Sequence, residues 1–348
     1  MGGRNGVARR VALLAAGVAI LGGSVASGAM AADILPPVVA SPIVVVPEHM
    51  PRFYANLNVL LMSRGQADPQ TILRFGGITV LSTNEVAFGM DAADFHFGWS
   101  FGLQGRAGVF VKNGLALEAG AFWIRPLVAT VDMFGGGAAY SLSTDPDFAE
   151  IGLGPLDGAL GYDRTGLHGF EANAVATLDH GFTVYGGATY IRLRDELAIE
   201  VLRDFEDENE RFTWTADNRM IGPQVGLRFA HEAQRATFGF DVRAAYLFNS
   251  VFASFVSGPA DGGIDVEDTD DAKTRTLMLA AGVNTGFRLS NALVLTLGYQ
   301  IMSFNNVATG FAQILGTVPE FFPNDAELTA TFGPLVVHGL TAGVTLTY

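Results

Sequence analysis

The chain has 348 residues, of which 49% are hydrophobic, and it contains no cysteine. Without cysteine it can form neither a disulfide framework nor a thiolate metal site, and it cannot carry a lipoprotein anchor. Its 21 Lys and Arg residues are outnumbered by 35 Asp and Glu residues, which gives a formal net charge of −14. This charge argues against nucleic acid as a partner and against direct attraction to anionic lipid.

Residues 1–31 have the three parts of a secretory signal peptide. Arg4, Arg9 and Arg10 form a basic region, an apolar run follows, and residues 29–31 (AMA) fit an A-x-A cleavage site. We expect a cleaved signal peptide rather than a retained N-terminal membrane anchor. Export of a cysteine-free chain indicates an envelope of the Gram-negative type.

Residues 32–51 are rich in proline, which holds the backbone extended and cannot donate to a β-ladder. We interpret this stretch as a periplasmic linker. After the signal peptide no run of about 18 apolar residues could form a spanning helix, so any membrane crossing must use strands.

Ten segments between residues 52 and 348 alternate apolar and polar side chains with the two-residue period of a β-strand. Each is about twice as long as the ~5 to 6 residues usual for a soluble strand. The segments are approximately 52–63, 96–111, 115–125, 166–178, 182–194, 218–229, 237–249, 274–289, 292–303 and 336–348.

The connections between these segments alternate in length. Short turns of residues that tolerate hairpin geometry lie at 112–114, 179–181, 230–236 and 290–291. The long connections are about 64–95, 126–165, 195–217, 250–273 and 304–335. In outer-membrane barrels short turns are periplasmic and long loops are extracellular. The sequence therefore predicts an all-β fold over residues 52–348, a transmembrane up-and-down antiparallel β-barrel of ten strands, or of twelve if the partly alternating stretch 71–90 adds a hairpin.

The segment 96–111 illustrates how the two strand faces divide. Its odd positions are apolar and include Trp99 and Leu103, whereas its even positions are mostly glycine or polar and include Arg106. The other segments also keep their mid-strand charges on the polar face. Such strands suit either a membrane barrel with apolar side chains toward lipid or a soluble sandwich with those side chains in its core.

Three features favour the membrane barrel. The segments are long enough to cross a bilayer as tilted strands, which takes ~9 to 11 residues each. The sequence ends on Tyr348, which is similar to the aromatic C-terminal signal of many outer-membrane barrels. Aromatic residues on the apolar face also gather near both strand ends, as in membrane girdles. At the long-loop end these are Phe97, Trp99, Trp123, Tyr190, Tyr246, Phe248 and Tyr299, and at the short-turn end Phe182, Phe238, Phe287 and Tyr348.

The polar face supplies the candidate functional residues. Those predicted to line the lumen are Arg106, Glu118, Glu171, Gln224, Arg228, Asp241, Arg243, Asn284 and Arg288. Such ions either line a small polar pore or pair into a network that blocks it. Many other inward positions are glycine, which either lets strands bend around a narrow barrel or leaves space for water. The favoured hypothesis is passive diffusion of small ions or solutes through a narrow lumen. The alternative is a non-conducting structural or adhesion barrel that displays its loops.

The acidic stretch 261–273 contains the candidates for a metal site, Asp265, Glu267, Asp268 and Asp270. Carboxylates bind Ca²⁺ or bridge lipopolysaccharide through divalent ions, but this spacing lacks the EF-hand pattern, so a hydrated loop is the simpler interpretation. We interpret the charged run 194–211 in the same way, as a hydrated and partly helical loop. No cofactor is expected.

The six histidines bear on an enzymatic function. His180 and His231 fall in short turns, and one histidine precedes the barrel. Of the three near the outer rim, only His96 has inward parity. A converging acid–base pair is therefore hard to assemble, and we predict no enzymatic activity.

Five stretches of the barrel carry a family likeness: FYANLNVLLMSR (53–64), GATYIRLRDEL (187–197), NRMIGPQVGLRF (218–229), LGYQIMSFNNVA (297–308) and HGLTAGVTLTY (338–348). Together and in this order they resemble the planctomycete-type outer-membrane β-barrel proteins, which are similar to the pore-forming major outer-membrane proteins of the Legionella kind. The resemblance covers most of residues 52–348. It implies one barrel domain in the outer membrane with a pore role, and no catalytic residues.

Two positions depart from simple alternation. Pro223 cannot donate to the ladder and predicts a bulge, and Arg192 has lipid-side parity at a place from which it can reach the interface.

The expected partners are outer-membrane lipid, lipopolysaccharide and small ions or solutes, without nucleic acid. Homo-oligomerisation and a role of 126–165 as a plug inside the barrel are left open.

Overall fold

The computed structural model describes residues 53–66, 71–75, 89–112, 114–145, 149–202, 209–290, 292–319 and 326–348. Residues 50–348 form one compact unit, and almost all of its described part is antiparallel β-sheet. The predicted signal peptide (1–31) and linker (32–51) lie outside the described residues. No helix in the described part of the chain is long and apolar enough to cross a membrane.

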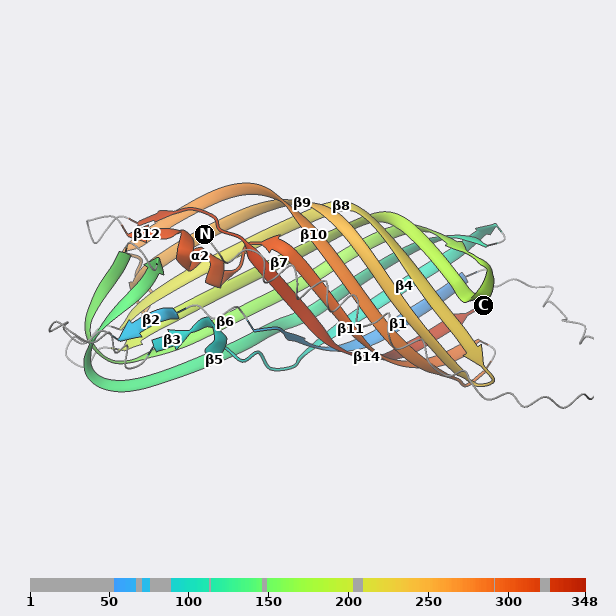
Figure 1. The fold of residues 1–348 in the computed structure, drawn as a ribbon, viewed down its shortest axis with the longest axis horizontal. Helices are drawn as coiled ribbons and strands as arrows, with labels where there is room; N and C mark the ends of the chain where they lie inside the picture. The colour runs from blue at the N-terminus through green and yellow to red at the C-terminus, as the bar shows by residue number, and fades with distance from the viewer. Residues whose placement is uncertain are drawn as a thin grey trace, which may run out of the picture. The chain divides into compact units, whose positions relative to one another are not determined.

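Ten tilted strands close a barrel (Figure 1). They are β1 (Phe53–Arg64), β4 (Ser100–Lys112), β5 (Leu115–Asp145), β6 (Ala149–Thr177), β7 (Phe182–Leu202), β8 (Glu210–Ala233), β9 (Ala236–Pro259), β10 (Val266–Arg288), β11 (Leu293–Val307) and β14 (Gly333–Thr347). Each pairs antiparallel with the barrel strands before and after it, and β1 pairs with β14 to complete the ring. The predicted up-and-down barrel of ten strands is confirmed.

A hairpin also forms within the stretch 71–90, but it does not enlarge the ring. β2 (Thr71–Phe75) pairs with β3 (Gly89–Asp91), and the 3₁₀ turn η1 (Ala92–Asp94) follows. β2 pairs in addition with the far part of β5, where Leu73 faces Leu142. The sheet thus has twelve strands among the described residues, while β5 and β6 close the barrel at ten.

Six of the strands are much longer than predicted. β5 to β10 contain 31, 29, 21, 24, 24 and 23 residues. Most of the predicted loops 126–165, 195–217 and 250–273 are therefore strand. The predicted partly helical loop at 194–211 is wrong for residues 194–202 and 210–211, which are strand, while residues 203–208 lie outside the described ranges. The described part of 126–165 belongs to the barrel wall and does not fold into the lumen as a plug.

The face of the sheet that carries the apolar side chains changes along these long strands. Near the short turns apolar side chains face outward as predicted, and Val109 is 59% exposed. Farther along β7 and β8 the apolar side chains face inward, so that Leu197 and Trp214 are fully buried, while Glu196 and Thr215 occupy the outward positions beside them. A strand that has left the bilayer meets water on its outer face, and it can bury apolar side chains only inside the barrel.

The outer surface consequently has two zones. We call the apolar zone that runs from the short turns to the aromatic residues Trp123, Phe170, Tyr190 and Phe248 the lipid-facing belt, and the strands beyond it the outer extension. Outward charges begin directly beyond the belt. The predicted aromatic girdle is present there, except that Phe97 packs against the internal apolar clusters instead.

The short turns match the predicted positions. Gln234 and Arg235 connect β8 to β9, the 3₁₀ turn η2 (Asp179–Gly181) connects β6 to β7, and His180 and Gln234 have positive φ angles of 63° and 53°.

The bulge predicted at Pro223 is wrong. The ladder between β8 and β9 is interrupted there, but its register is the same on both sides, with Ile221 facing Phe248 and Gln224 facing Ala245.

The long connection between β11 and β14 contains a short helix, α2 (Gly310–Gly316), and the strands β12 (Thr317–Pro319) and β13 (Ala326–Leu328), which pair with each other. Figure 1 places α2 at the end of the barrel opposite to the C-terminus. The helix begins at Thr309, whose side-chain oxygen accepts a hydrogen bond from the Ala312 amide, as an N-cap does. Phe311 and Ile314 of α2 are buried with Trp214 and Phe255 in one apolar cluster, so this segment fills the outer extension.

Candidate functional site

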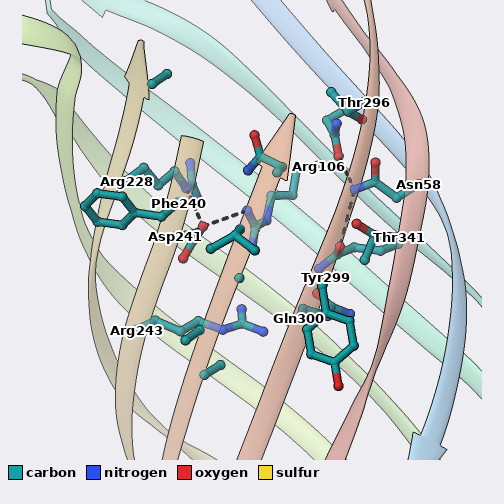
Figure 2. A pocket seen from close by; sticks show the side chains of 18 of the residues that line it. Asn58, Arg106, Arg228, Phe240, Asp241, Arg243, Thr296, Tyr299, Gln300 and Thr341 are labelled. Carbon is teal, nitrogen blue, oxygen red and sulfur yellow. Dashed lines mark hydrogen bonds and ion pairs between the residues drawn. The ribbon is translucent and has the colours of Figure 1, made fainter. Parts of the chain in front are cut away.

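Six of the predicted luminal residues form one ion network inside the belt region of the barrel. Each of its three arginines bridges or caps carboxylates from other strands, as Figure 2 shows for Arg106, Asp241 and Arg228. The nitrogen–oxygen distances are Arg106–Glu171 2.8 Å, Arg106–Asp241 3.2 Å, Arg228–Asp241 2.9 Å, Arg228–Glu118 2.7 Å and Arg243–Glu171 2.7 Å. Three guanidinium groups face three carboxylates, so the network is formally neutral.

Neutral side chains complete the network. The hydroxyl of Tyr54 donates to Glu118 at 2.6 Å, and that of Tyr185 donates to Asp241 at 2.8 Å. The Gln224 amide donates to Glu171 at 3.2 Å and to Asn173 at 2.8 Å. Sequence reasoning did not single out Tyr54, Tyr185 or Asn173 as site residues. Their inward strand parity was the available signal.

Two glycines of the barrel wall leave the space that these tyrosine rings occupy. A Cβ atom at Gly108 would lie 2.3 Å from the Tyr54 ring, and one at Gly226 would lie 2.2 Å from the Tyr185 ring. Each tyrosine therefore lies flat against the strand beside it. At these two positions glycine makes room for a side chain.

A cavity of about 370 Å³ adjoins the network. Arg106, Arg228, Asp241 and Arg243 lie on one side of it, and Figure 2 shows amides and hydroxyls on the other. These include Asn58, Thr296, Gln300 and Thr341. Asn284 also lines the cavity and is exposed, which indicates that solvent reaches this space.

Glu118 also lines the cavity, whereas the other three predicted luminal residues lie apart from it. Glu171 and Gln224 stand behind the arginines within the network. Arg288 is at the end of β10 near the short turns, where it pairs with the exposed Glu232. The structure thus brings together eight of the nine predicted luminal residues in or around one network and places Arg288 at the rim.

An apolar layer closes the cavity on its outer side. Nine of the ten barrel strands contribute to it, and every member is at most 3% exposed. Its members are Leu60, Met62, Ile124, Leu127, Leu167, Ile191, Leu193, Met220, Ala245, Leu247, Met278, Met302, Phe304, Val307, Leu335 and Val337. Since side chains from opposite walls pack into one buried cluster, this layer occupies the cross-section of the lumen.

A second polar group lies beyond the apolar layer, in the outer extension. Arg64 Nη1 contacts Asp163 at 3.0 Å, Asp195 at 2.8 Å and the Thr165 hydroxyl at 2.6 Å. Asp195 also accepts the backbone N–H of Gly310 at 2.8 Å and so holds the start of α2. Burial raises the pKa of Asp163 well above its usual range, the nearby Asp195 raises it further, and Arg64 opposes both.

Two of the four predicted metal candidates have structural partners. Asp268 accepts the Leu328 amide at 2.6 Å and Asp270 accepts the Ala330 amide at 2.8 Å, while Asp265 and Glu267 are exposed. Two acidic side chains of β10 thereby tie down the segment around β13. Within the described ranges, no three His, Cys, Asp or Glu side chains form a group that could hold a metal ion.

The histidines near the outer rim stand apart from the luminal acids. His338 Nδ1 lies 2.8 Å from the Tyr299 hydroxyl on the outer surface, and the exposed His96 lies 3.2 Å from the Gln66 amide. His168 occupies an outward position on β6, paired with Arg192. The absence of enzymatic activity stays a prediction.

No protein-family model and no curated protein matches this sequence. Among solved structures, the chain is similar to the outer-membrane protease OmpT of Escherichia coli, with a TM-score of 0.51, 11% identity, and coverage of 85% of this chain and 96% of that one. It is also similar to the Neisserial surface protein NspA (TM-score 0.27, 10% identity, 85% and 97% covered) and to a Pseudomonas aeruginosa FadL homologue (TM-score 0.29, 13% identity, 85% and 90% covered). The likeness to OmpT shows the fold, that of an outer-membrane β-barrel.

Proposed function

We propose that the chain is an outer-membrane β-barrel that does not conduct solutes and that displays its outer extension as a rigid surface scaffold. The membrane location is supported by the apolar belt between two sets of aromatic residues, because a water-exposed barrel would not carry such a belt. The orientation follows from loop length, which puts the short turns in the periplasm and the outer extension outside the cell.

The closed lumen is the observation that carries this proposal. The apolar layer around Leu60 and Met302 consists of buried, packed side chains, and the cluster around Trp214 and α2 lies in series with it. An ion that entered the polar cavity from the periplasm would have to pass through both packed layers, whose apolar side chains cannot replace its hydration shell, and this costs far more than thermal energy. The polar cavity supports the competing hypothesis of passive diffusion, but it reaches only as far as Met302.

Conductance of the refolded protein in planar bilayers tests the proposal. We expect no channel steps from the wild type or from Arg106→Ala with Arg243→Ala. A positive control replaces Leu60, Leu247 and Met302 by Ser and also exchanges residues 309–331 for a Gly-Ser linker. We expect this variant to conduct, because it weakens both barriers.

Channel steps in the wild type would overturn the closed-barrel proposal. If the Arg106→Ala, Arg243→Ala variant then changed the ion preference, passive diffusion through the network would be the function. Insertion is checked in every sample by protease resistance, so that an absence of channel steps cannot be due to protein that stayed outside the bilayer.

A further inference from the structure

We propose that the outer surface at the junction of the belt and the outer extension binds a phosphorylated glycolipid of the outer leaflet, with its phosphates on a row of basic side chains and its sugars in a groove above them. This inference rests on the outer-membrane placement proposed above. Two separate observations carry it, one for each half of the ligand.

The basic row follows one line of the strand register across β6 to β10, with Ser250 between Arg219 and Lys273. Strand register joins His168 to Arg192, Arg192 to Arg219, Arg219 to Ser250 and Ser250 to Lys273. Two residues closer to the short turns on β6, β7 and β9 stand Phe170, Tyr190 and Phe248, which belong to the aromatic edge of the belt. Lipid headgroups lie at this depth, and the arginine side chains are 35% (Arg192) and 60% (Arg219) exposed.

One carboxylate orients both central arginines. Asp217 accepts two bonds from Arg192 at 2.8 Å each, and two from Arg219 at 3.3 and 3.1 Å. Burial alone would raise the pKa of Asp217, but the bonds from the two arginines outweigh it and keep the pKa below its usual range. Each guanidinium has five N–H donors, so each keeps three for an external anion. Two guanidinium groups against one carboxylate also leave a net positive charge, which suits a phosphate.

A groove of about 520 Å³ lies on the outer face farther along β6, β7 and β8 and extends onto β5. Its lining begins four residues beyond the basic row, at Arg164 on β6 and Glu196 on β7, which is about 13 Å along a strand. The groove is lined by Thr130, Asp132, Leu160, Gly161, Tyr162, Arg164, Glu196, Ala198, Glu200 and Arg211. Hydroxyl, carboxylate and guanidinium groups around an aromatic ring suit the hydroxyls and apolar faces of sugars.

The basic row and the groove together favour a glycolipid over an ordinary phospholipid. A phospholipid would place its phosphate on Arg192 and Arg219 and leave the groove empty. A ligand with phosphate at the headgroup level and a saccharide rising from it occupies both features at their observed spacing.

The binding test uses the refolded protein in neutral phosphatidylcholine nanodiscs. The probes are lipopolysaccharide with its core sugars, lipid A without them, dephosphorylated lipopolysaccharide, and phosphatidylglycerol. We expect Arg192→Gln with Arg219→Gln to weaken binding of lipopolysaccharide and of lipid A about tenfold or more, as expected for lost charge-assisted hydrogen bonds. The matched control, Lys112→Gln with Arg235→Gln, removes two exposed charges at the short-turn end and should bind as the wild type does.

A second variant tests the groove alone. Tyr162→Ser should weaken binding of core-bearing lipopolysaccharide several-fold and leave lipid A binding unchanged. Equal binding of phosphatidylglycerol, or unchanged affinity in the Arg192, Arg219 double variant, would overturn the proposal. Channel activity would refute the closed barrel and leave this site intact, whereas failure to insert into any bilayer would remove the basis of both.

Discussion

At the level of single residues, the most unusual group is the one buried around Arg64. One guanidinium faces two carboxylates, Asp163 and Asp195, and both carboxylate side chains are fully buried. Arg64 Nε and one oxygen of Asp163 have no hydrogen-bond partner among the described residues. Burying two negative charges against one positive charge is costly, and protonation of Asp163 relieves that cost.

Asp163→Asn should therefore change how stability depends on pH. The pKa of Asp163 is raised in the folded protein, so folding retains a proton that the unfolded chain releases above about pH 4. The wild type should lose stability relative to the variant as pH rises from about 4 toward the folded-state pKa, by up to ~1.4 kcal/mol per pH unit. Urea unfolding in lipid vesicles at a series of pH values measures this difference.

The matched control for this change is Asp261→Asn, the same substitution at an exposed position. Its stability should follow that of the wild type across the series. A constant difference between wild type and Asp163→Asn at every pH would contradict the raised pKa.

At the level of elements, α2 depends on its surroundings for its conformation. It has seven residues, fewer than an isolated helix needs in water. Tertiary anchors hold it on both sides. Asn218 donates to the Ala308 carbonyl at 2.7 Å and accepts the Ala308 amide at 2.9 Å, and the Trp214 indole donates to Thr317 at 3.0 Å. The long connection at 304–335 thus becomes the cap of the barrel interior.

Gly310→Ala should loosen this cap. A Cβ at Gly310 would lie 2.5 Å from the Leu197 Cβ and 2.8 Å from the Leu197 backbone nitrogen, so α2 must move away from β7. We expect a cost of about 1 to 3 kcal/mol, typical of overpacking. Hydrogen exchange at the Gln313 amide, which donates to the Thr309 carbonyl, should become faster. Gly333→Ala is the control because no atom lies within 4 Å of its added Cβ, and unchanged exchange in Gly310→Ala would refute the tight packing.

At the level of the whole molecule, the barrel interior is layered along its axis. A polar network, an apolar layer, the Arg64 group and the α2 cluster follow one another from the short turns outward. The outer surface changes from apolar to polar along the same direction. The membrane position of the barrel follows from this change, because the continuous apolar surface among the described residues is that of the belt region.

The three tryptophans provide a test of that position. Trp99 and Trp123 are 54% and 50% exposed at the edge of the belt, whereas Trp214 is fully buried in the outer extension. In single-tryptophan variants reconstituted with brominated phosphatidylcholine, lipid should quench the fluorescence of Trp99 and Trp123 strongly and that of Trp214 weakly. Equal quenching of all three, or stronger quenching of Trp214, would contradict the proposed orientation.

Local alternation was sufficient to predict much of the molecule. Whether Arg106 and Leu103 face opposite sides depends only on their parity within one strand, and the ten segments, their turns and most luminal charges followed from that rule. The rule failed where the environment outside the wall changed. The strand segments around Leu197 and Trp214 alternate as regularly as the segment around Leu103, but their apolar side chains point inward. Because the prediction required an apolar outer face, the predicted strands ended too early.

The sequence by itself determined the fold class, the strand count and the face on which each belt residue lies, because these depend on neighbours one and two positions apart. Only the tertiary structure decided which inward side chains meet. Arg228 reaches Glu118, 110 positions away, and Leu60 packs in one layer with Met302, because closure and stagger of the ring bring distant strands to one level. Whether the lumen is open or filled depends on these contacts across the barrel. The number of inward charges does not decide it, because ion pairing and apolar packing between distant strands fill the lumen.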